Sequence, residues 1–158
     1  MQPAHDGTRD FDFLFGTWRV AHNKLRQRHA GSSDWDSFNG TAETRPLLGG
    51  IGNVEENHMP GDGASGIALR TFDLKRGRWS IYWMSSRDGL LQPPVVGRFE
   101  GGTGRFEGED IDEGRPIRAR FLWHPLTRDT CHWEQAFSLD SGATWETNWT
   151  MDFIRLAD

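Results

Sequence analysis

Turn-forming glycines recur about every ten residues along this chain, and the segments between them show almost no helical periodicity. This spacing is typical of antiparallel β-sandwiches and barrels. We interpret about ten segments as strands in up-and-down order: Trp18–Arg28, Trp35–Thr44, Gly52–His58, Gly66–Leu74, Arg78–Ser86, Val95–Glu100, Arg105–Asp112, Pro116–His124, Cys131–Leu139 and Thr144–Arg155. Because one apolar face runs through all of them, they are most simply buried by closing into a barrel, which also removes unpaired edges.

We therefore expect an all-β, ten-stranded, up-and-down antiparallel barrel with a short N-terminal cap. A length of 158 residues suits a single domain over 1–158, with residues 1–10 expected to form a flexible tail.

The hairpin turns predict strand register, because side chains alternate between the two faces of a strand. A turn at Leu74–Gly77 predicts the facing pairs Asp73–Arg78, Phe72–Trp79 and Arg70–Ile81. A turn at Gly101–Gly104 predicts the facing pairs Glu100–Arg105, Arg98–Glu107 and Phe99–Phe106. In both hairpins opposite charges share one face and apolar side chains share the other, which a slip of one residue would destroy.

The last three strands predict stacked layers across the sheet. With a turn at Asp140–Gly142, the expected layers are Phe121/Trp133/Trp149, Ala119/Gln135/Thr147 and Ile117/Phe137/Trp145. The middle layer holds an amide and a hydroxyl between aromatic side chains. Burying these groups without partners costs about 1–3 kcal/mol each, so we expect them to bond each other, hold water or contact a ligand.

The segment FDFLFGTW precedes the first strand and suits the cap of a barrel. We expect Phe11, Phe13, Leu14 and Phe15 to cover the open base, Gly16 to turn the chain, and Trp18 to point inward as the floor. This arrangement resembles the Gly-x-Trp signature that opens the first strand of lipocalins and their relatives in the calycin superfamily.

Nearly the whole chain is similar to small bacterial lipocalin-like proteins whose function is uncharacterised. The resemblance implies a barrel with an internal cavity, and it brings no catalytic residues to transfer. Ten strands also resemble the fatty-acid-binding proteins, but their helix pair between the first two strands has no counterpart around Ala30–Asp34. Heme-binding relatives of similar shape exist, so heme stays open although no cofactor is predicted.

Arg70 is expected on the inward face, where a buried guanidinium needs a partner. Glu56, on the neighbouring strand, is the expected partner; alternatively Arg70 holds a ligand carboxylate or phosphate bidentately. Glycines around Gly52–His58 permit a bulge, and a shift of one residue would place Glu55 and Asn57 inside instead.

Binding of a small hydrophobic molecule, with or without an anionic group, is the leading interpretation of the barrel interior. The candidate ligand-binding residues are Arg70, Glu56, Trp83, Phe121, Trp133, Gln135, Thr147 and Trp149. Two alternatives remain open. The barrel could enclose an isomerase, cyclase or lyase reaction, or its eight tryptophans could fill a solid core used as an interaction module.

The enzyme alternative needs a titratable group inside the barrel. Glu56 and His22 are the candidate acids or bases, and Tyr82 is disfavoured because it falls on the outward face. Cys131 lies in an apolar layer, where a thiol is unreactive. The six histidines match no zinc or facial-triad spacing, so no metal site is expected.

The net charge of −5 is spread over interspersed acidic and basic residues, which gives no reason to expect nucleic acid as a partner. No apolar run approaches the ~20 residues that span a bilayer, so we expect no membrane insertion. The start MQPAHDGTRD lacks an apolar signal core, and the lone Cys131 fits a reducing compartment. We expect a cytoplasmic monomer or homodimer.

Overall fold

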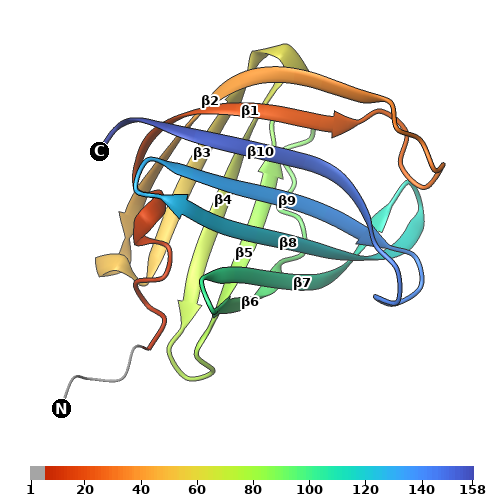
Figure 1. Ribbon diagram of the computed structural model, residues 1–158. Helices are drawn as coiled ribbons and strands as arrows, with labels where there is room; N and C mark the ends of the chain where they lie inside the picture. The colour runs from red at the N-terminus through yellow and green to blue at the C-terminus, as the bar shows by residue number, and fades with distance from the viewer. Residues whose placement is uncertain (1–5) are drawn as a thin grey trace.

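The computed structural model describes residues 6–158, and these form a closed barrel of ten antiparallel strands (Figure 1). The strands are β1 (Gly16–Leu25), β2 (Trp35–Leu47), β3 (Gly52–Met59), β4 (Ala64–Asp73), β5 (Arg78–Ser85), β6 (Val95–Glu100), β7 (Thr103–Asp112), β8 (Arg115–Thr127), β9 (Thr130–Ser138) and β10 (Glu146–Ala157). Each strand pairs with its neighbours in the chain, and β1 closes the barrel against β10. The expected all-β, up-and-down barrel is confirmed.

Three single-turn 3-10 helices accompany the strands in the described part of the chain: η1 (Asp12–Leu14), η2 (Leu48–Gly50) and η3 (Pro60–Asp62). Among residues 6–158, no helix has the length and apolar character that crossing a membrane requires.

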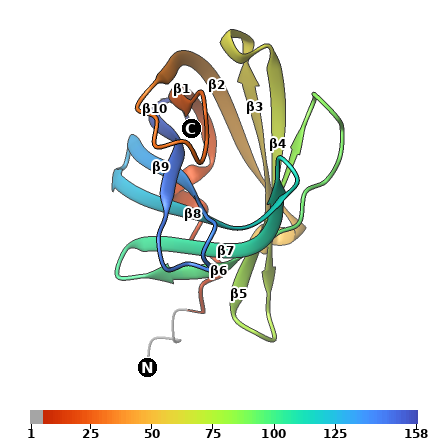
Figure 2. The same cartoon turned by 90° about the vertical axis from the view of Figure 1, so that its right-hand side faces the viewer.

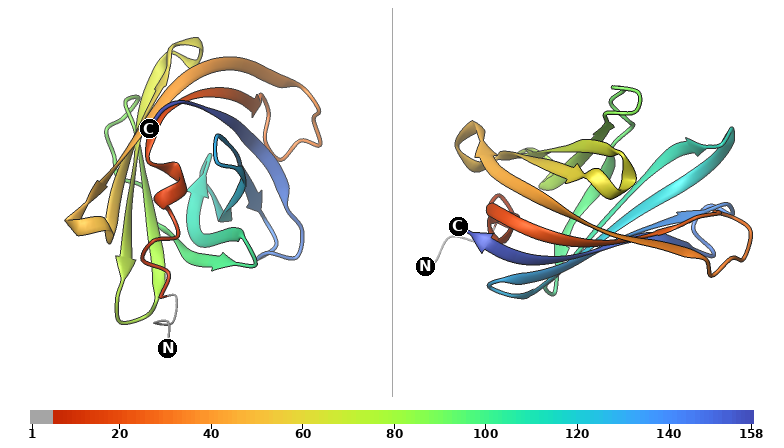
Figure 3. Two further views of the ribbon diagram at one scale, coloured as in Figure 1. Left: turned by 60° about the vertical axis from the view of Figure 1, so that its left-hand side comes forward. Right: turned by 90° about the horizontal axis from the view of Figure 1, so that it is seen from above.

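The segment before β1 closes one end of the barrel, where β1 begins and β10 ends (Figures 1 and 3). Phe11 and Leu14 are fully buried there. Gly16 has φ +119°, and a Cβ on it would lie 2.5 Å from the carbonyl oxygen of Ala157, so the turn into β1 requires glycine. Trp18 follows as the fully buried floor. The expected cap is confirmed.

Arg155 on β10 holds this cap in place. Its guanidinium lies 4.2 Å from the centroid of the Trp18 ring, and its two terminal nitrogens donate to the carbonyls of Phe15 and Phe13 at 2.5 and 2.7 Å. The Trp18 indole in turn donates to the carbonyl of Leu14 at 2.9 Å. The role of Arg155 cannot be predicted from the sequence, because its partners lie at the other end of the chain.

The expected tail of residues 1–10 divides into two parts. Residues 1–5 lie outside the described residues. Gly7 lies against the barrel, since its carbonyl accepts a hydrogen bond from the Trp79 indole at 3.0 Å and a Cβ on it would lie 3.1 Å from the Phe72 ring. The chain from Gly7 onward therefore packs against the base of the barrel.

The predicted register is confirmed in the β4–β5 hairpin, where Asp73 faces Arg78 and Phe72 faces Trp79. In the β6–β7 hairpin the predicted register is wrong by two residues. Gly101 and Gly102 both have positive φ and form a two-residue turn, which replaces the expected four-residue turn. A shift of two residues keeps every side chain on its expected face.

The β8–β9 and β9–β10 registers also differ by two residues from the prediction. Trp123 faces Trp133 and Phe121 faces Gln135 across β8 and β9, while Trp149 faces Gln135 across β9 and β10. The expected layers are therefore wrong in height but keep their inward faces. Thr147 and Trp145 are exceptions. A bulge between Thr147 and Trp149 reverses the face of Thr147 and puts it opposite Ala136. Trp145 lies before the start of β10, and its ring packs 4.5 Å from the guanidinium of Arg120, which alternates with the inward residues of β8, so its expected inward position is wrong.

The expected face of β3 is wrong, and the alternative shifted by one residue is the observed one. Asn53, Glu55 and Asn57 are at most 2% exposed, whereas Glu56 is exposed on the outer face. The turn at η2 precedes β3 and includes Gly49 at φ +68°, so the strand begins one residue out of the expected phase.

Candidate functional site

A small cavity of about 30 Å³ lies inside the barrel. Five aromatic side chains from β5, β8, β9 and β10 line it: Trp83, Phe121, Trp123, Trp133 and Trp149. The aromatic rings contact one another edge to face, with centroids 5.3 Å apart for Trp133 and Trp149 and 5.7 Å apart for Trp83 and Trp149. Gln135, Arg70 and Glu55 supply the polar part of the wall.

A second cavity of about 60 Å³ adjoins the first toward the end of the barrel opposite the cap. The two cavities share four wall residues, which are Ile81, Trp83, Phe121 and Gln135. Residues 92–94, which belong to the connection between β5 and β6, also line the second cavity. The polar and aromatic walls therefore continue from the barrel centre toward this connection.

The pairing between neighbouring strands is shortest between β5 and β6. Three facing pairs join these strands, and the half of β5 from Tyr82 to Ser85 has no partner on β6 within the described chain. The connection from Ser86 to Pro94 covers this gap and contacts β5 through a Met84–Leu91 bridge. Figure 2 shows this connection as a long green loop at the side of the barrel. It is the part of the wall with the fewest strand hydrogen bonds to break.

Arg70 and Glu55 form a buried ion pair at the base of the cavity. The Arg70 guanidinium donates to Glu55 at 2.7 Å and to the amide oxygen of Asn53 at 2.9 Å. Glu55 also accepts hydrogen bonds from Asn57 and, at 3.5 Å, from Thr44. Both charged side chains are 2% exposed. Glu55, not Glu56, is thus the partner that the inward arginine requires.

Aromatic rings complete the surroundings of Arg70. Its guanidinium carbon lies 5.0 Å from the centroid of the Phe11 ring and 5.3 Å from that of Trp123. The Nε of Arg70 and the Nε1 of Trp123 are buried without a hydrogen-bond partner among the described residues. The sequence singles out neither of these N–H groups.

His22 faces inward, as expected, but is part of the packing. The Trp149 indole donates to His22 Nδ1 at 3.1 Å, which places the imidazole proton on Nε2. The ring stacks on Phe38 with centroids 4.7 Å apart. Burial, aided by the nearby Lys24 charge, lowers the pKa of His22 to about 4. His22 is therefore neutral near pH 7, and it does not line the cavity.

The bulge in β10 determines the polar partner of Gln135. The Gln135 amide donates to the Asn148 side-chain oxygen at 2.8 Å, and Asn148 is 3% exposed. Thr147, which was expected at this position, does not line either cavity. The bulge cannot be predicted from this sequence, because Thr147 and Asn148 are both polar and either could face the barrel interior beside Gln135.

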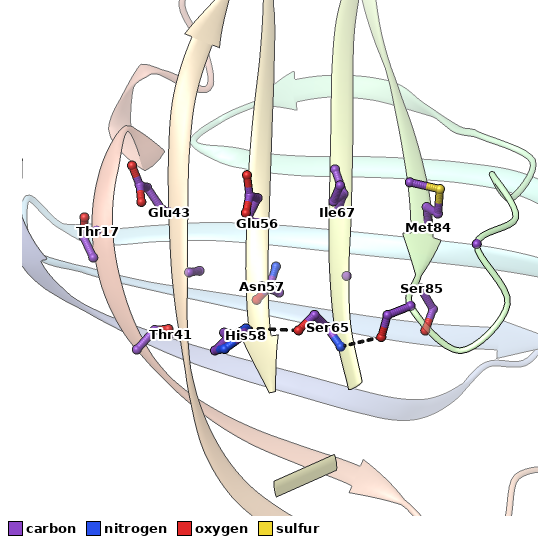
Figure 4. Close-up of a pocket in the computed structure, with 14 residues that line it drawn as sticks. Thr17, Thr41, Glu43, Glu56, Asn57, His58, Ser65, Ile67, Met84 and Ser85 are labelled. Atoms are coloured by element: carbon purple, nitrogen blue, oxygen red, sulfur yellow. Dashed lines mark hydrogen bonds between the residues drawn. The ribbon is translucent and has the colours of Figure 1, made fainter. Parts of the chain in front are cut away.

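An open groove of about 510 Å³ crosses the outer face of β2 to β5 (Figure 4). Glu43 and Glu56 face each other across β2 and β3, and His58 Nδ1 lies 3.0 Å from Ser65 Oγ. The expected inward position of Glu56 is therefore wrong. This groove cannot be predicted from the sequence, because it depends on the curvature of the sheet.

The candidate residues thus divide between two places. Arg70, Trp83, Phe121, Trp133, Gln135 and Trp149 meet around one cavity, whereas Glu56 lies in the outer groove and Thr147 lies outside both. Within residues 6–158, no group of three His, Cys, Asp or Glu side chains is close enough to hold a metal ion.

No protein-family model and no curated protein matches this sequence. Among solved structures, the chain is similar to the S-type phycobiliprotein lyase CPES from Guillardia theta, at 12% sequence identity and a TM-score of 0.55. The match covers 92% of this chain and 89% of that chain. The similarity extends over nearly the whole chain, and the fold of this chain is a closed, lipocalin-like β-barrel.

Proposed function

We propose that the protein binds a small hydrophobic molecule inside the barrel, between Trp83, Phe121, Trp133 and Trp149. The observation that carries this proposal is the ring of aromatic side chains around a cavity inside the barrel that Gln135 also lines. A mostly apolar cavity with a few converging polar groups is the usual form of a small-molecule site.

The volumes of the two cavities require a wall side chain to move on binding. They measure about 30 and 60 Å³, whereas small-molecule sites measure roughly 300 to 1,000 Å³. Trp83 is the side chain suited to this movement. It lines both cavities, it is only partly buried, and it lies on the half of β5 without a β6 partner. Displacing its indole would join the two cavities.

Gly66 supports this assignment of Trp83. A Cβ on Gly66 would lie 2.1 Å from the Trp83 ring, so the indole occupies its place only because β4 carries a glycine there. The atoms Cη2 and Cζ2 of the ring lie nearest to the Gly66 backbone, and the Trp149 ring packs against Trp83 with centroids 5.7 Å apart. Packing against these neighbours holds the indole in place.

The residues do not fit a heme site. His22 is the inward histidine, but its Nδ1 accepts the Trp149 hydrogen bond and its ring stacks on Phe38. It is not part of the cavity wall. We therefore include no heme in the proposed function.

Equilibrium dialysis with 2-ethylnaphthalene tests the proposal, and native mass spectrometry of freshly purified protein adds a search for a retained ligand. We expect saturable binding of one molecule per chain. Trp83→Ala should bind 2-ethylnaphthalene more tightly, because it supplies the missing volume. Trp35→Ala, which removes an exposed tryptophan from β2, is the matched control and should change nothing. Absence of binding to both the wild type and Trp83→Ala would overturn the proposed function.

A further inference from the structure

Two wall residues of the cavity carry buried hydrogen-bond donors that have no partner. Arg70 and Trp123 are each 1% exposed and line the 30 Å³ cavity. Arg70 Nε and Trp123 Nε1 are the unpartnered buried polar atoms of that wall within residues 6–158. Both are N–H donors, and a buried donor without an acceptor costs about 1–3 kcal/mol. An acceptor placed against this wall of the cavity would satisfy them.

The charge of Arg70 is already neutralised. Glu55 accepts from Arg70 at 2.7 Å, and both side chains are 2% exposed. A carboxylate or phosphate placed beside Arg70 would share it with Glu55 and leave one buried negative charge uncompensated, which is costly in a dry interior. Asn57 and Thr44 also donate to Glu55, and these contacts hold its carboxylate in place. An acceptor without charge avoids this repulsion.

We propose that the ligand presents an uncharged hydrogen-bond acceptor, such as a ketone, aldehyde or ester carbonyl, to the N–H groups of Arg70 and Trp123. This inference rests on the proposed function and gives the chemical class of the ligand. The carbonyl lies at the end of the cavity near the cap, where Arg70 also contacts Phe11. The apolar body of the ligand extends toward Trp83 and the second cavity, away from the ion pair.

Three naphthalenes of nearly equal shape test the assignment. 2-Acetonaphthone carries a neutral acceptor, 2-ethylnaphthalene replaces the carbonyl by a methylene, and 2-naphthoate carries a negative charge. Dissociation constants at pH 7 would be measured by equilibrium dialysis. We expect 2-acetonaphthone to bind about three- to tenfold more tightly than 2-ethylnaphthalene, which is the net effect of about one hydrogen bond. 2-Naphthoate should bind at least about tenfold more weakly than 2-acetonaphthone.

Trp123→Phe removes one of the two donors and should reduce the preference for 2-acetonaphthone over 2-ethylnaphthalene. Trp145→Phe is the matched control, since Trp145 contacts Arg120 and does not line the cavity. It should leave the preference unchanged. If Trp123→Phe fails to fold, the comparison of the three compounds on the wild type still decides the question.

The outcomes separate this inference from the proposed function. Binding of no naphthalene to the wild type or to Trp83→Ala overturns both. Equal affinities for 2-acetonaphthone and 2-ethylnaphthalene overturn the carbonyl assignment and leave the proposed function standing. Tightest binding of 2-naphthoate would show that Arg70 receives an anion despite Glu55, and would also overturn this inference.

Discussion

Replacing Arg70 by methionine measures how much the stability of the barrel depends on its buried ion pair. Arg70 and Glu55 are both 2% exposed and 2.7 Å apart, so the substitution leaves a carboxylate in the interior without its counter-charge. Breaking a buried pair in this way costs about 3–5 kcal/mol. For a domain of 158 residues, each kcal/mol lowers the melting temperature by about 3 °C, so we expect a fall of about 9–15 °C.

The partner variant identifies the origin of this loss. The double variant Arg70→Met/Glu55→Gln has no unpaired carboxylate in the interior. We therefore expect it to regain a large part of the stability that Arg70→Met loses. Arg118→Met is the surface control. Arg118 pairs with Glu107 and Glu109 but is 37% exposed, and its replacement should cost less than about 1 kcal/mol.

Calorimetry and urea unfolding of the three variants would measure these differences. A loss below about 1 kcal/mol in Arg70→Met would refute the reasoning, because it would mean that Glu55 does not depend on Arg70 as its buried counter-charge. An equal loss in Arg70→Met and in the double variant would also refute it, since the cost would then come from lost packing.

Three further predictions concern the cap, a histidine and the cysteine. Gly16→Ala should destabilise the protein by more than about 2 kcal/mol in urea unfolding, because the added Cβ meets the Ala157 carbonyl. Gly49→Ala, also at positive φ but with open space around it, is the control and should cost only about 1 kcal/mol. Equal losses in the two variants would contradict the steric argument. The pKa of His22 is lowered to about 4 from 6.5, so its contribution to stability is complete above about pH 6.5 and is lost as the pH falls toward 4, a change of about 3 kcal/mol. His22→Gln should flatten the dependence of unfolding free energy on pH in that window, and an unchanged slope would contradict the assignment. Burial strongly raises the pKa of the Cys131 thiol, so it should react with a disulfide reagent only after unfolding; fast reaction of the native protein would show that β9 opens locally.

Features carried within single hairpins could be predicted from the sequence. Glycine-marked turns and alternating faces predict ten strands and their closure, and Gly16 with Trp18 predicts the cap. The faces of Trp83, Phe121, Trp133, Gln135 and Trp149 follow from alternation alone, and they are the residues that meet at the cavity.

Register errors show where local patterns stop being informative. The Gly101–Gly102 turn moves β6 against β7 by two residues, and alternation cannot detect a shift that preserves the faces. The bulge at Asn148 changes a face within one strand, and Thr147 is as polar as the residue that replaces it. Neither feature changes the hydrophobic pattern from which the strands are predicted.

The sequence by itself determined the barrel, its cap and the inward aromatic face, because these depend on contacts between residues close in the chain or on the two-residue period of a strand. Only the tertiary structure decided between Glu55 and Glu56, since the phase of β3 depends on how the η2 turn is accommodated against β4. Tertiary structure also decided the small volume of the cavity. The Trp83 indole fills the space above Gly66, and that contact between two strands leaves no trace in the spacing of either residue.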